Sequence, residues 1–394
     1  MGASLRKKIR DLREQYPHLS LTEARDFILK TESKNGWEQG LWFTELGIEN
    51  VATWNPEHTW NSTYSANIRV PIGITPEGLE LRRKLFSPED PKGSPEYPNV
   101  IEGKQGSGKR YLTEKIAAAL WESVITLDIA QISSGGTGPH GVLAGMTSSG
   151  KSVMLQNVVT GLAAKHSPFD LQFMLLDFKG GAIFEGYEKL PHVVCVRNCV
   201  EEHKEYVPLV REAVELEMQR REEILRAAGS RDVQEYNASR DRSERLPHVL
   251  IVVDEFHEAL RTDGRDGDIK KLFTRVGSKG RSLGMHLLLS AQLFDENSLS
   301  GVSQHLNYGI SLKTSNARTS ELVIGTDEAT RLPHGRGQAI IRKWDGTTEK
   351  FTGFNTATEI APGIRAYEGI ISRISAANVT GHEWGTEALR EKLS

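Results

Sequence analysis

The chain has 394 residues, 38% of them hydrophobic and 26% charged, with a formal net charge of −3. These proportions are typical of a globular protein and exclude a disordered chain. The slightly acidic balance gives no overall signal for nucleic acid, although it does not speak against a local basic face. No apolar run reaches the roughly 18 residues of a membrane helix, and no apolar segment of a signal peptide follows the basic start. We therefore expect a cytoplasmic protein.

The cysteine content excludes two further classes of protein. Only Cys195 and Cys199 occur, which is too few for a disulfide framework and a poor set for a zinc site. We expect both to be ordinary thiols in a reducing compartment.

Residues 1–65 are predicted to form a small helical region. Residues 5–15 are basic and amphipathic, and the helix predicted over residues 21–30 begins with the capping box Ser20-Leu-Thr-Glu23. Four of the seven tryptophans, at positions 37, 42, 54 and 60, fall in this region. We expect them to pack it onto the rest of the protein, since tryptophan is usually buried. The alternative is a partner-binding face.

Two strands are predicted on either side of a long insertion. Residues 68–74 contain Pro71, which cannot donate to a central ladder, so we expect an edge strand there. Residues 124–129 are its expected partner. The insertion between them, residues 79–122, is expected to be a flexible or helical surface segment.

The insertion contains a sequence that imitates a phosphate loop, Gly103-Lys-Gln-Gly-Ser-Gly-Lys-Arg110. Arg110 stands where a Ser or Thr hydroxyl would meet Mg²⁺. No buried strand precedes it, and no apolar strand ending in Asp-Glu follows before residue 145. We therefore do not expect a second nucleotide site.

The most informative motif fits G-x-x-x-x-G-K-[ST], the phosphate-binding loop of ATPases. It consists of Gly145, Met146, Thr147, Ser148, Ser149, Gly150, Lys151 and Ser152. It lies between a predicted strand, 141–144, and a predicted helix, 153–164, so that a helix N-terminus would face the phosphates. Lys151 is expected to reach the β- and γ-phosphates of ATP, and the Ser152 hydroxyl to bind Mg²⁺. The alternative is a glycine-rich turn in an unrelated α/β protein.

A second motif follows about a hundred residues later, in Val249-Leu-Ile-Val-Val-Asp254-Glu255-Phe256. Its continuous apolar run predicts a parallel strand buried on both faces. Asp254 is expected to hold Mg²⁺, and Glu255 to act as the general base that polarises the attacking water. Alone, an apolar strand ending in Asp-Glu is a weak indication of an ATPase site. Together with the phosphate loop, it becomes a strong one.

From residue 137 onwards, strands and helices alternate. The remaining predicted strands are 171–177, 286–292, 308–312 and 337–342, and the remaining predicted helices are 201–228, ended by Gly229, and 269–278. This alternation predicts an α/β fold with a parallel sheet and right-handed crossovers.

These residues together resemble the FtsK/SpoIIIE ATPase superfamily, and within it the EccC ATPases of type VII (ESX) secretion, especially their first ATPase module. The matching segments are Gly138–Gly141, the phosphate loop, Leu176–Ala182, Leu190–Val193, Arg220–Gly229, Asp254–Phe256 and Gly280–Leu289. The resemblance covers about residues 65–75 and 124–345. It implies a RecA-like P-loop ATPase domain over 66–356, with a central, mostly parallel sheet, after the helical region 1–65 and before a tail, 357–394.

The resemblance also implies further site residues. Gln292 matches the family's sensor, beside the Asp-Glu strand, and Lys179 belongs to a glycine turn near the nucleotide. The family implies an arginine donated across a subunit interface, where it stabilises transition-state charge. Arg281 is the first candidate and Arg211 a weaker one. The alternative for Arg281 is an ordinary surface charge at a helix end.

The function that the resemblance implies is a motor subunit that couples ATP and Mg²⁺ to the export of small helical WXG-type proteins. Its expected partners are other ATPase modules or copies of itself, and a membrane secretion complex that recruits it to the inner face of the membrane. Two alternatives stay open: an FtsK-like DNA translocase, and a regulatory nucleotide binder without hydrolysis.

The chain departs from the family pattern in its organisation. The resemblance implies a membrane anchor and several ATPase modules in tandem, whereas this chain has one credible module. We expect an excised piece, a split subunit or a stand-alone relative. Ala-Gln-Leu after the sensor strand replaces the more usual Ser-Gln-Arg, which removes no catalytic group.

Overall fold

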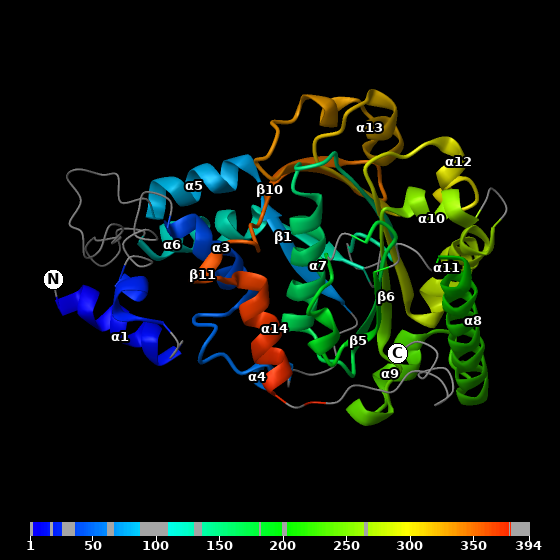
Figure 1. Cartoon of the computed structure of the whole chain (residues 1–394), viewed down its shortest axis with the longest axis horizontal. Helices are drawn as coiled ribbons and strands as arrows, with labels where there is room; N and C mark the ends of the chain where they lie inside the picture. Colours follow the sequence, from blue (N-terminus) through cyan, green and yellow to red (C-terminus); the bar gives the residue numbers. More distant parts are fainter. Residues whose placement is uncertain are drawn as a thin grey trace.

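The computed structural model describes residues 3–15, 19–25, 36–60, 67–86, 109–129, 136–180, 183–198, 203–263, 267–377 and 379. The described residues form a ten-stranded sheet that runs through the molecule (Figure 1). Its order is β2 (Val124–Asp128), β1 (Arg69–Ile74), β10 (Thr348–Gly353), β9 (Gln338–Arg342), β8 (Tyr308–Ser311), β3 (His140–Ala144), β7 (Met285–Ala291), β6 (His248–Asp254), β4 (Leu171–Asp177) and β5 (Val193–Asn198).

The sheet has a parallel half and an antiparallel half. The strands from β8 to β5 in this order are parallel to their neighbours. The strands β2, β1, β10, β9 and β8 pair antiparallel. The predicted α/β class with a mostly parallel sheet is confirmed. The antiparallel strand β10 was not predicted, because Thr348-Glu-Lys-Phe-Thr-Gly carries little apolar signal.

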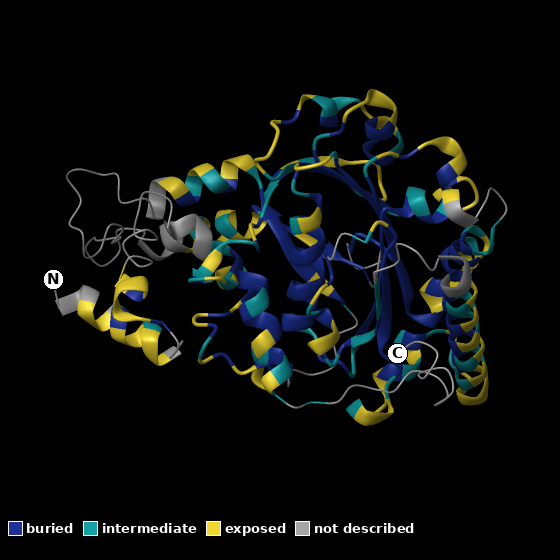
Figure 2. Ribbon diagram, in the orientation of Figure 1, coloured by how far each residue is buried: buried dark blue, intermediate teal, exposed yellow. Residues whose placement is uncertain are grey.

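Helices cover both faces of the sheet. One face carries α3 (Gly36–Leu46), α4 (Pro56–Trp60), α7 (Lys151–Lys165) and α14 (Ala366–Ala376), and the other carries α8 (His203–Ala228), α9 (Val233–Ala238), α10 (Phe256–Asp263), α11 (Asp268–Leu283) and α13 (Ala317–Ile324). The other described elements are α1 (Ala3–Gln15), α5 (Pro76–Phe86), α6 (Lys109–Glu122), α12 (Glu296–Leu299), the short 3₁₀ turns Tyr187–Lys189, Arg242–Glu244, Ser303–His305 and Glu328–Arg331, and the strand pair β11 (Glu359–Ala361) and β12 (Ile364–Arg365). The buried sheet lies between helices whose outward faces are exposed (Figure 2).

The two faces of the sheet build two separate hydrophobic cores. In β6, Leu250 and Val252 belong to the core under α7, whereas Val249, Ile251 and Val253 belong to the core under α8 and α11. Successive side chains of a strand point to opposite faces, so a strand buried on both sides must be apolar throughout. This is why the apolar runs predicted the central strands.

The prediction that residues 68–74 form an edge strand is wrong. β1 pairs with β2 on one side and with β10 on the other, and β2 lies at the edge. Pro71 is tolerated because β10 pairs only with Gly73 and Ile74, so the half of β1 that contains Pro71 has a partner on one side only. The ladder to β2 also shifts register between Pro71 and Gly73. The predicted pairing with residues 124–129 is confirmed.

The N-terminal region packs onto the body through its tryptophans, as expected. Trp42, Trp54 and Trp60 are buried in the core under α7. The indole N–H of Trp60 donates to the carbonyl of Ala163 in α7, at 3.1 Å. The side chain of Trp37 lies outside the described residues.

Two smaller predictions concern the start of the chain and the insertion. Ser20 and Glu23 form the predicted capping box, since each side chain accepts the other's backbone N–H at 3.2 and 2.9 Å. The described parts of the insertion are α5 and α6, so its helical alternative is confirmed there. The phosphate-loop imitation at 103–108 lies outside the described residues.

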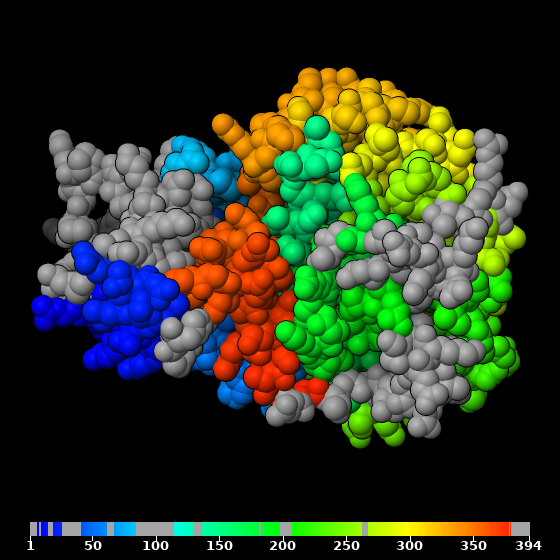
Figure 3. Space-filling view, in the orientation of Figure 1, coloured from blue at the N-terminus to red at the C-terminus, as the bar shows by residue number. Residues whose placement is uncertain are grey.

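Residues after 356 extend the core under α7. Ile370 and Ile374 of α14 are buried in it, and Arg373 donates two N–H groups to the carbonyl of Trp54, at 2.7 and 3.1 Å. In Figure 3, α14 (red) lies on the visible face between N-terminal residues (blue) and the green segment after the phosphate loop. The domain boundaries at 65 and 357 stay predictions.

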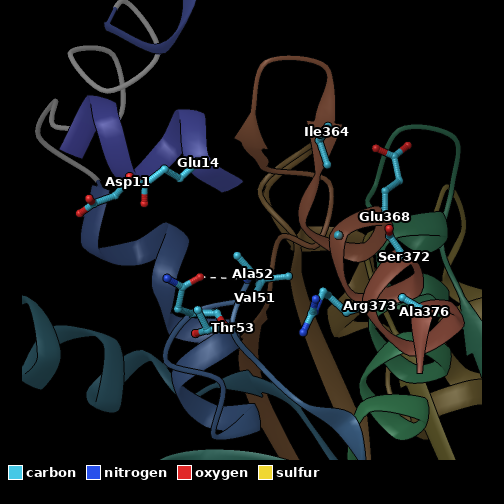
Figure 4. A pocket seen from close by; sticks show the side chains of 12 residues that line it. Asp11, Glu14, Val51, Ala52, Thr53, Ile364, Glu368, Ser372, Arg373 and Ala376 are labelled. Atoms are coloured by element: carbon cyan, nitrogen blue, oxygen red, sulfur yellow. Dashed lines mark hydrogen bonds between the residues drawn. The ribbon is translucent and has the colours of Figure 1, made fainter. Parts of the chain in front are cut away.

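A surface hollow of about 900 Å³ lies where α1, residues 50–53 and α14 meet (Figure 4). Asp11, Glu14 and Glu368 supply carboxylates to its wall. The guanidinium of Arg373 also lines it but is already bound to a backbone carbonyl. The hollow shares no lining residue with the phosphate loop.

Four histidines are buried near the ends where the parallel strands begin: His140, His192, His248 and His286. Burial lowers the pKa of His140 and His248 to about 3 and that of His192 to about 4. It also lowers the pKa of His286 well below its usual value. The rings of His248 and His286 share a hydrogen bond between Nδ1 and Nε2, at 2.8 Å. All four are therefore neutral in the folded protein at neutral pH.

We predict that the free energy of unfolding falls as the pH is lowered from 7.5 to 5.5. The unfolded chain protonates these imidazoles below about pH 6.5, whereas the folded chain does not, so each contributes a slope of up to about 1.4 kcal/mol per pH unit. Urea denaturation across this range measures the slope. His192→Gln keeps a donor for the carbonyl of His166 and should reduce the slope, whereas His334→Gln, at an exposed position, should leave it unchanged. A flat profile for the parent would contradict the prediction.

Candidate nucleotide-binding site

The phosphate loop connects β3 to α7 at the carboxyl end of the parallel strands. Ser148 and Gly150 have positive φ angles of 60° and 104°, which turn the chain sharply before the helix begins at Lys151. The first N–H groups of α7 have no partner within the helix, so they are donors for an anion at the loop. The local geometry is therefore that of an anion-binding turn.

The loop opens onto a hollow of about 480 Å³. Its wall is formed by residues from the loop and from the carboxyl ends of neighbouring strands: Met146, Thr147, Ser148, Gly150, Lys151, Ser152, Val153, Asp177, Lys179, Ile183, Asp254, Glu255, Gln292 and Gly335. The hollow thus brings together most of the residues that the sequence singled out. Gly145 and Ser149 belong to the loop without lining it.

Lys151 lies between the two carboxylates of the second motif. Its ammonium group forms an ion pair with Asp254 Oδ1 and lies 3.4 Å from Glu255 Oε1. The three side chains are 7–10% exposed. Ser290, on β7, donates to the same Asp254 oxygen at 2.9 Å. Because buried charges need partners, these groups hold one another in a fixed arrangement.

Glu255 has an unusual backbone conformation, with a φ of 52°. A positive φ is uncommon for a residue with a side chain, and such strain is concentrated at functional sites. Here it occurs at the single residue between the end of β6 and the start of α10. The strained residue is the one whose carboxylate lines the hollow.

Three groups surround the Glu255 carboxylate. Besides Lys151, Gln292 Nε2 donates to Oε1 at 2.8 Å, and Lys179 Nζ lies 3.6 Å from Oε1. Burial alone would raise the pKa of Glu255, but the charge of Lys151, the Gln292 hydrogen bond and Lys179 together lower it below its usual value. The carboxylate is therefore ionised at neutral pH and can accept a proton.

Gln292 also connects the carboxylate to the phosphate loop. The hydroxyl of Thr147 donates to Gln292 Oε1 at 3.1 Å, while the other end of the same amide donates to Glu255. The family resemblance predicted that Gln292 belongs to the site. The hydrogen bond between Gln292 and Thr147 was not predicted, because a hydroxyl inside the loop does not by itself indicate a partner. A movement of the phosphate loop would therefore shift the Gln292 amide and, through it, the Glu255 carboxylate.

The donor set at the loop fits Mg²⁺. The Ser152 hydroxyl and the Asp254 carboxylate both line the hollow and both offer oxygen, the ligand atom that Mg²⁺ prefers. Within the described part of the chain, no group of three or more His, Cys, Asp and Glu side chains could hold a metal by itself. Mg²⁺ is commonly held by one or two protein oxygens together with phosphates. The metal roles stay predictions.

The candidate interface arginines do not join this site in their own chain. Arg281 is exposed in the last turn of α11, just before β7, so it lies where the parallel strands begin rather than where they end. Arg211, on α8, forms an ion pair with Asp268 at 2.8 Å. Neither position tests the predicted role, which needs a second subunit.

Ser290 and Gly335 contribute to the site although the sequence analysis did not single them out. Ser290 had a readable signal, as a polar residue in an apolar strand beside the Asp-Glu strand. Gly335 comes from the loop before β9, and nothing in the sequence connects that loop to residues almost two hundred positions earlier.

Comparison with known proteins agrees with this geometry. A model of the FtsK/SpoIIIE family matches residues 115–295. The chain carries an FtsK/SpoIIIE-family domain. The matched segment contains the phosphate loop, the Asp-Glu strand and Gln292, so the family pattern coincides with the hollow.

The curated relatives are ESX secretion system proteins. The ESX-4 secretion system protein EccC4 of Mycobacterium tuberculosis is 33% identical over 343 residues, which cover 86% of this chain and 24% of the relative. The ESX secretion system protein EccC of Thermomonospora curvata is 40% identical over 242 residues, covering 60% of this chain and 18% of the relative. The chain thus spans about a quarter or less of these two relatives.

A solved structure of an EccC protein also matches this chain. The cytoplasmic domain of the type VII secretion ATPase EccC from Thermomonospora curvata matches with a TM-score of 0.71 and 29% identity, covering 88% of this chain and 35% of that one. Because this match covers 88% of the chain, the FtsK/SpoIIIE domain and the residues on either side of it share one fold with a secretion ATPase.

Among the described residues, no helix is both long and apolar enough to cross a bilayer.

Proposed function

We propose that this chain is an ATP-hydrolysing motor module of a type VII (ESX)-like protein secretion system, with residues 66–356 as its motor domain. The observation that carries the proposal is the convergence of Lys151, Asp254 and Glu255 at the end of the phosphate loop. Phosphoryl transfer to water requires a phosphate-binding loop, a cation, a metal-binding carboxylate and a base.

The arrangement suggests how the residues act. Lys151 leaves Asp254 for the β- and γ-phosphates. Asp254 and Ser152 would hold Mg²⁺, which would neutralise charge on the phosphates. Glu255 then accepts a proton from a water molecule whose oxygen attacks the γ-phosphorus. The bond from that phosphorus to the bridging oxygen breaks, giving ADP and phosphate. Gln292 keeps the Glu255 carboxylate aimed during this step.

We predict that Glu255→Gln binds MgATP like the parent but hydrolyses it about 10²–10⁴-fold more slowly, because the amide cannot accept the proton. Lys151→Ala should lose MgATP binding, since it removes the main cation at the phosphates. Calorimetric titration and phosphate release measure the two steps separately.

Lys189→Ala is a matched control, because this exposed lysine lies outside the hollow. Binding by Lys151→Ala as tight as that of the parent would refute the site. If the parent binds nucleotide but does not hydrolyse it, at any protein concentration and with any partner tested, the result would favour a regulatory nucleotide binder.

The secretion role draws on the relatives. Their names describe ESX secretion proteins, which favours protein export over DNA translocation as the work that hydrolysis drives. On this proposal the partners are further ATPase modules or copies of this chain, the substrates are small helical WXG-type proteins, and a membrane complex recruits the module to the inner face of the membrane.

Arg281 is our proposed interface residue. Its exposure in the last turn of α11 leaves it accessible to a neighbouring subunit, and a cation supplied in trans stabilises charge on the γ-phosphate in the transition state. A single chain would then be a slow ATPase, because it cannot bring this guanidinium to its own nucleotide.

We predict that specific activity rises with protein concentration over a hundredfold range that includes the monomer. Arg281→Ala should remove the rise and leave nucleotide binding intact. Arg275→Ala, on the same helix and paired with Glu215, is the matched control and should keep the rise. High activity that stays constant on dilution into the monomeric range would rule out the interface mechanism.

A further inference from the structure

Lys179 is a second lysine in the wall of the nucleotide hollow. Among the described residues of that wall, Lys151 and Lys179 are the lysines, and three carboxylates, those of Asp177, Asp254 and Glu255, line it with them. The Lys151 side chain is 7% exposed and is shared by two carboxylates, whereas the Lys179 side chain is 56% exposed. The hollow therefore contains one buried cation held by carboxylates and one cation that water still surrounds.

The backbone at Lys179 is anchored to the end of the sheet. Asp177, the last residue of β4, is in register with Asp254, the last residue of β6. The N–H of Phe178 donates to the carbonyl of Asp254 at 3.2 Å, and the N–H of Lys179 donates to Asp177 Oδ1 at 2.9 Å. Phe178 is buried in the core under α8 and α11, and the next side chain, Lys179, lines the hollow. The main chain is thus fixed, while the long side chain can change direction.

The contact between Lys179 and Glu255 is loose. Lys179 Nζ lies 3.6 Å from Glu255 Oε1, which is longer than the about 2.7–2.9 Å of a charge-assisted hydrogen bond. Glu255 also receives the hydrogen bond of Gln292 and the charge of Lys151, so it keeps two partners without Lys179. An ion pair with an exposed partner contributes little, because water screens it. Lys179 can therefore leave Glu255 for a stronger anion.

The order of the strands places Lys179 at the γ-phosphate end of a bound nucleotide. The phosphate loop follows β3, and β7, β6 and β4 lie successively further from β3 in the sheet. Glu255 follows β6, and on the proposed function it faces the water that attacks the γ-phosphorus. Lys179 follows β4, on the far side of Glu255 from the loop. The part of the triphosphate that extends in this direction is its γ-phosphate.

We propose that Lys179 binds the γ-phosphate oxygens of ATP in its own chain and is a further catalytic residue. Its ammonium group exchanges the Glu255 carboxylate for the phosphate, so that Glu255 keeps the Gln292 hydrogen bond and accepts the proton of the attacking water. A cation at the γ-phosphate oxygens stabilises the charge that they carry in the transition state.

This inference rests on the proposed function and adds a residue that distinguishes the substrate from the product. ADP has no γ-phosphate, so Lys179 should contribute to the affinity for ATP and not to that for ADP. Lys151 differs, because it reaches the β-phosphate that both nucleotides carry.

The test compares the affinities of MgATP and MgADP, measured by calorimetry in the Glu255→Gln background, which should hardly consume ATP. Lys179→Met removes the charge and keeps most of the length of the side chain. It should weaken MgATP by about tenfold and leave MgADP unchanged within about twofold. Lys179→Arg keeps a cation and should retain most of the preference for ATP. With Glu255 intact, Lys179→Met should also slow hydrolysis at saturating ATP by about tenfold or more.

Lys189→Met is the matched control, since it makes the same change at an exposed lysine outside the hollow. It should alter neither affinity nor hydrolysis. Thermal melting checks that each variant is folded.

The outcomes separate this inference from the proposed function. If Lys179→Met slows hydrolysis but binds MgATP like its parent, Lys179 acts only through Glu255 and the γ-phosphate contact is wrong. If it weakens MgATP and MgADP equally, the contact is again wrong. If Lys151→Ala binds both nucleotides like the parent, the proposed function fails instead.

Protein concentration tests whether Lys179 acts within its own chain. The loss of MgATP affinity in Lys179→Met should be the same in the monomeric range as at a hundredfold higher concentration. A loss that appears only at the higher concentration would overturn the inference, because Lys179 would then serve the site of a neighbouring subunit.

Discussion

The site depends on one buried ammonium group shared by two carboxylates. Lys151 lies against Asp254 and 3.4 Å from Glu255, and all three side chains are almost removed from water. Two carboxylates this close need a cation, because unpaired buried charges are costly. A bound triphosphate would attract Lys151 away, so the divalent cation that accompanies it would replace the lysine at Asp254. Binding of nucleotide and of metal should therefore be coupled through Asp254.

The parallel half of the sheet is what brings these groups together. β3, β7, β6 and β4 end at the same edge, and in register Asp177 of β4 stands beside Asp254 of β6. The strands are buried on both faces, so their polar residues are concentrated at their ends. Ser290 and Gln292, at the end of β7, then contact the two carboxylates. The antiparallel strands lie on the other side of the loop, beyond β8.

The sequence predicted the parts of the molecule that have short-range signals. Stretches of about ten residues are enough to recognise the glycine-rich loop, the Asp-Glu strand and the apolar runs. Pro71 misled the prediction for β1, because its effect depends on where β10 stops pairing. β10 itself was missed because its residues are mostly polar. The contacts of Thr147 with Gln292, and of residues 335–337 with the phosphate loop, depend on tertiary packing that no local pattern encodes.

The most direct test of the central claim is an experimental structure of Glu255→Gln with ATP and Mg²⁺, since this variant should hold the nucleotide without consuming it. We predict Lys151 Nζ on the β- and γ-phosphates and away from Asp254, Mg²⁺ near Ser152 and Asp254, and the side chain at 255 facing the γ-phosphate. A nucleotide bound elsewhere, or one bound at the loop while Lys151 stays paired with Asp254, would contradict the proposed use of this site.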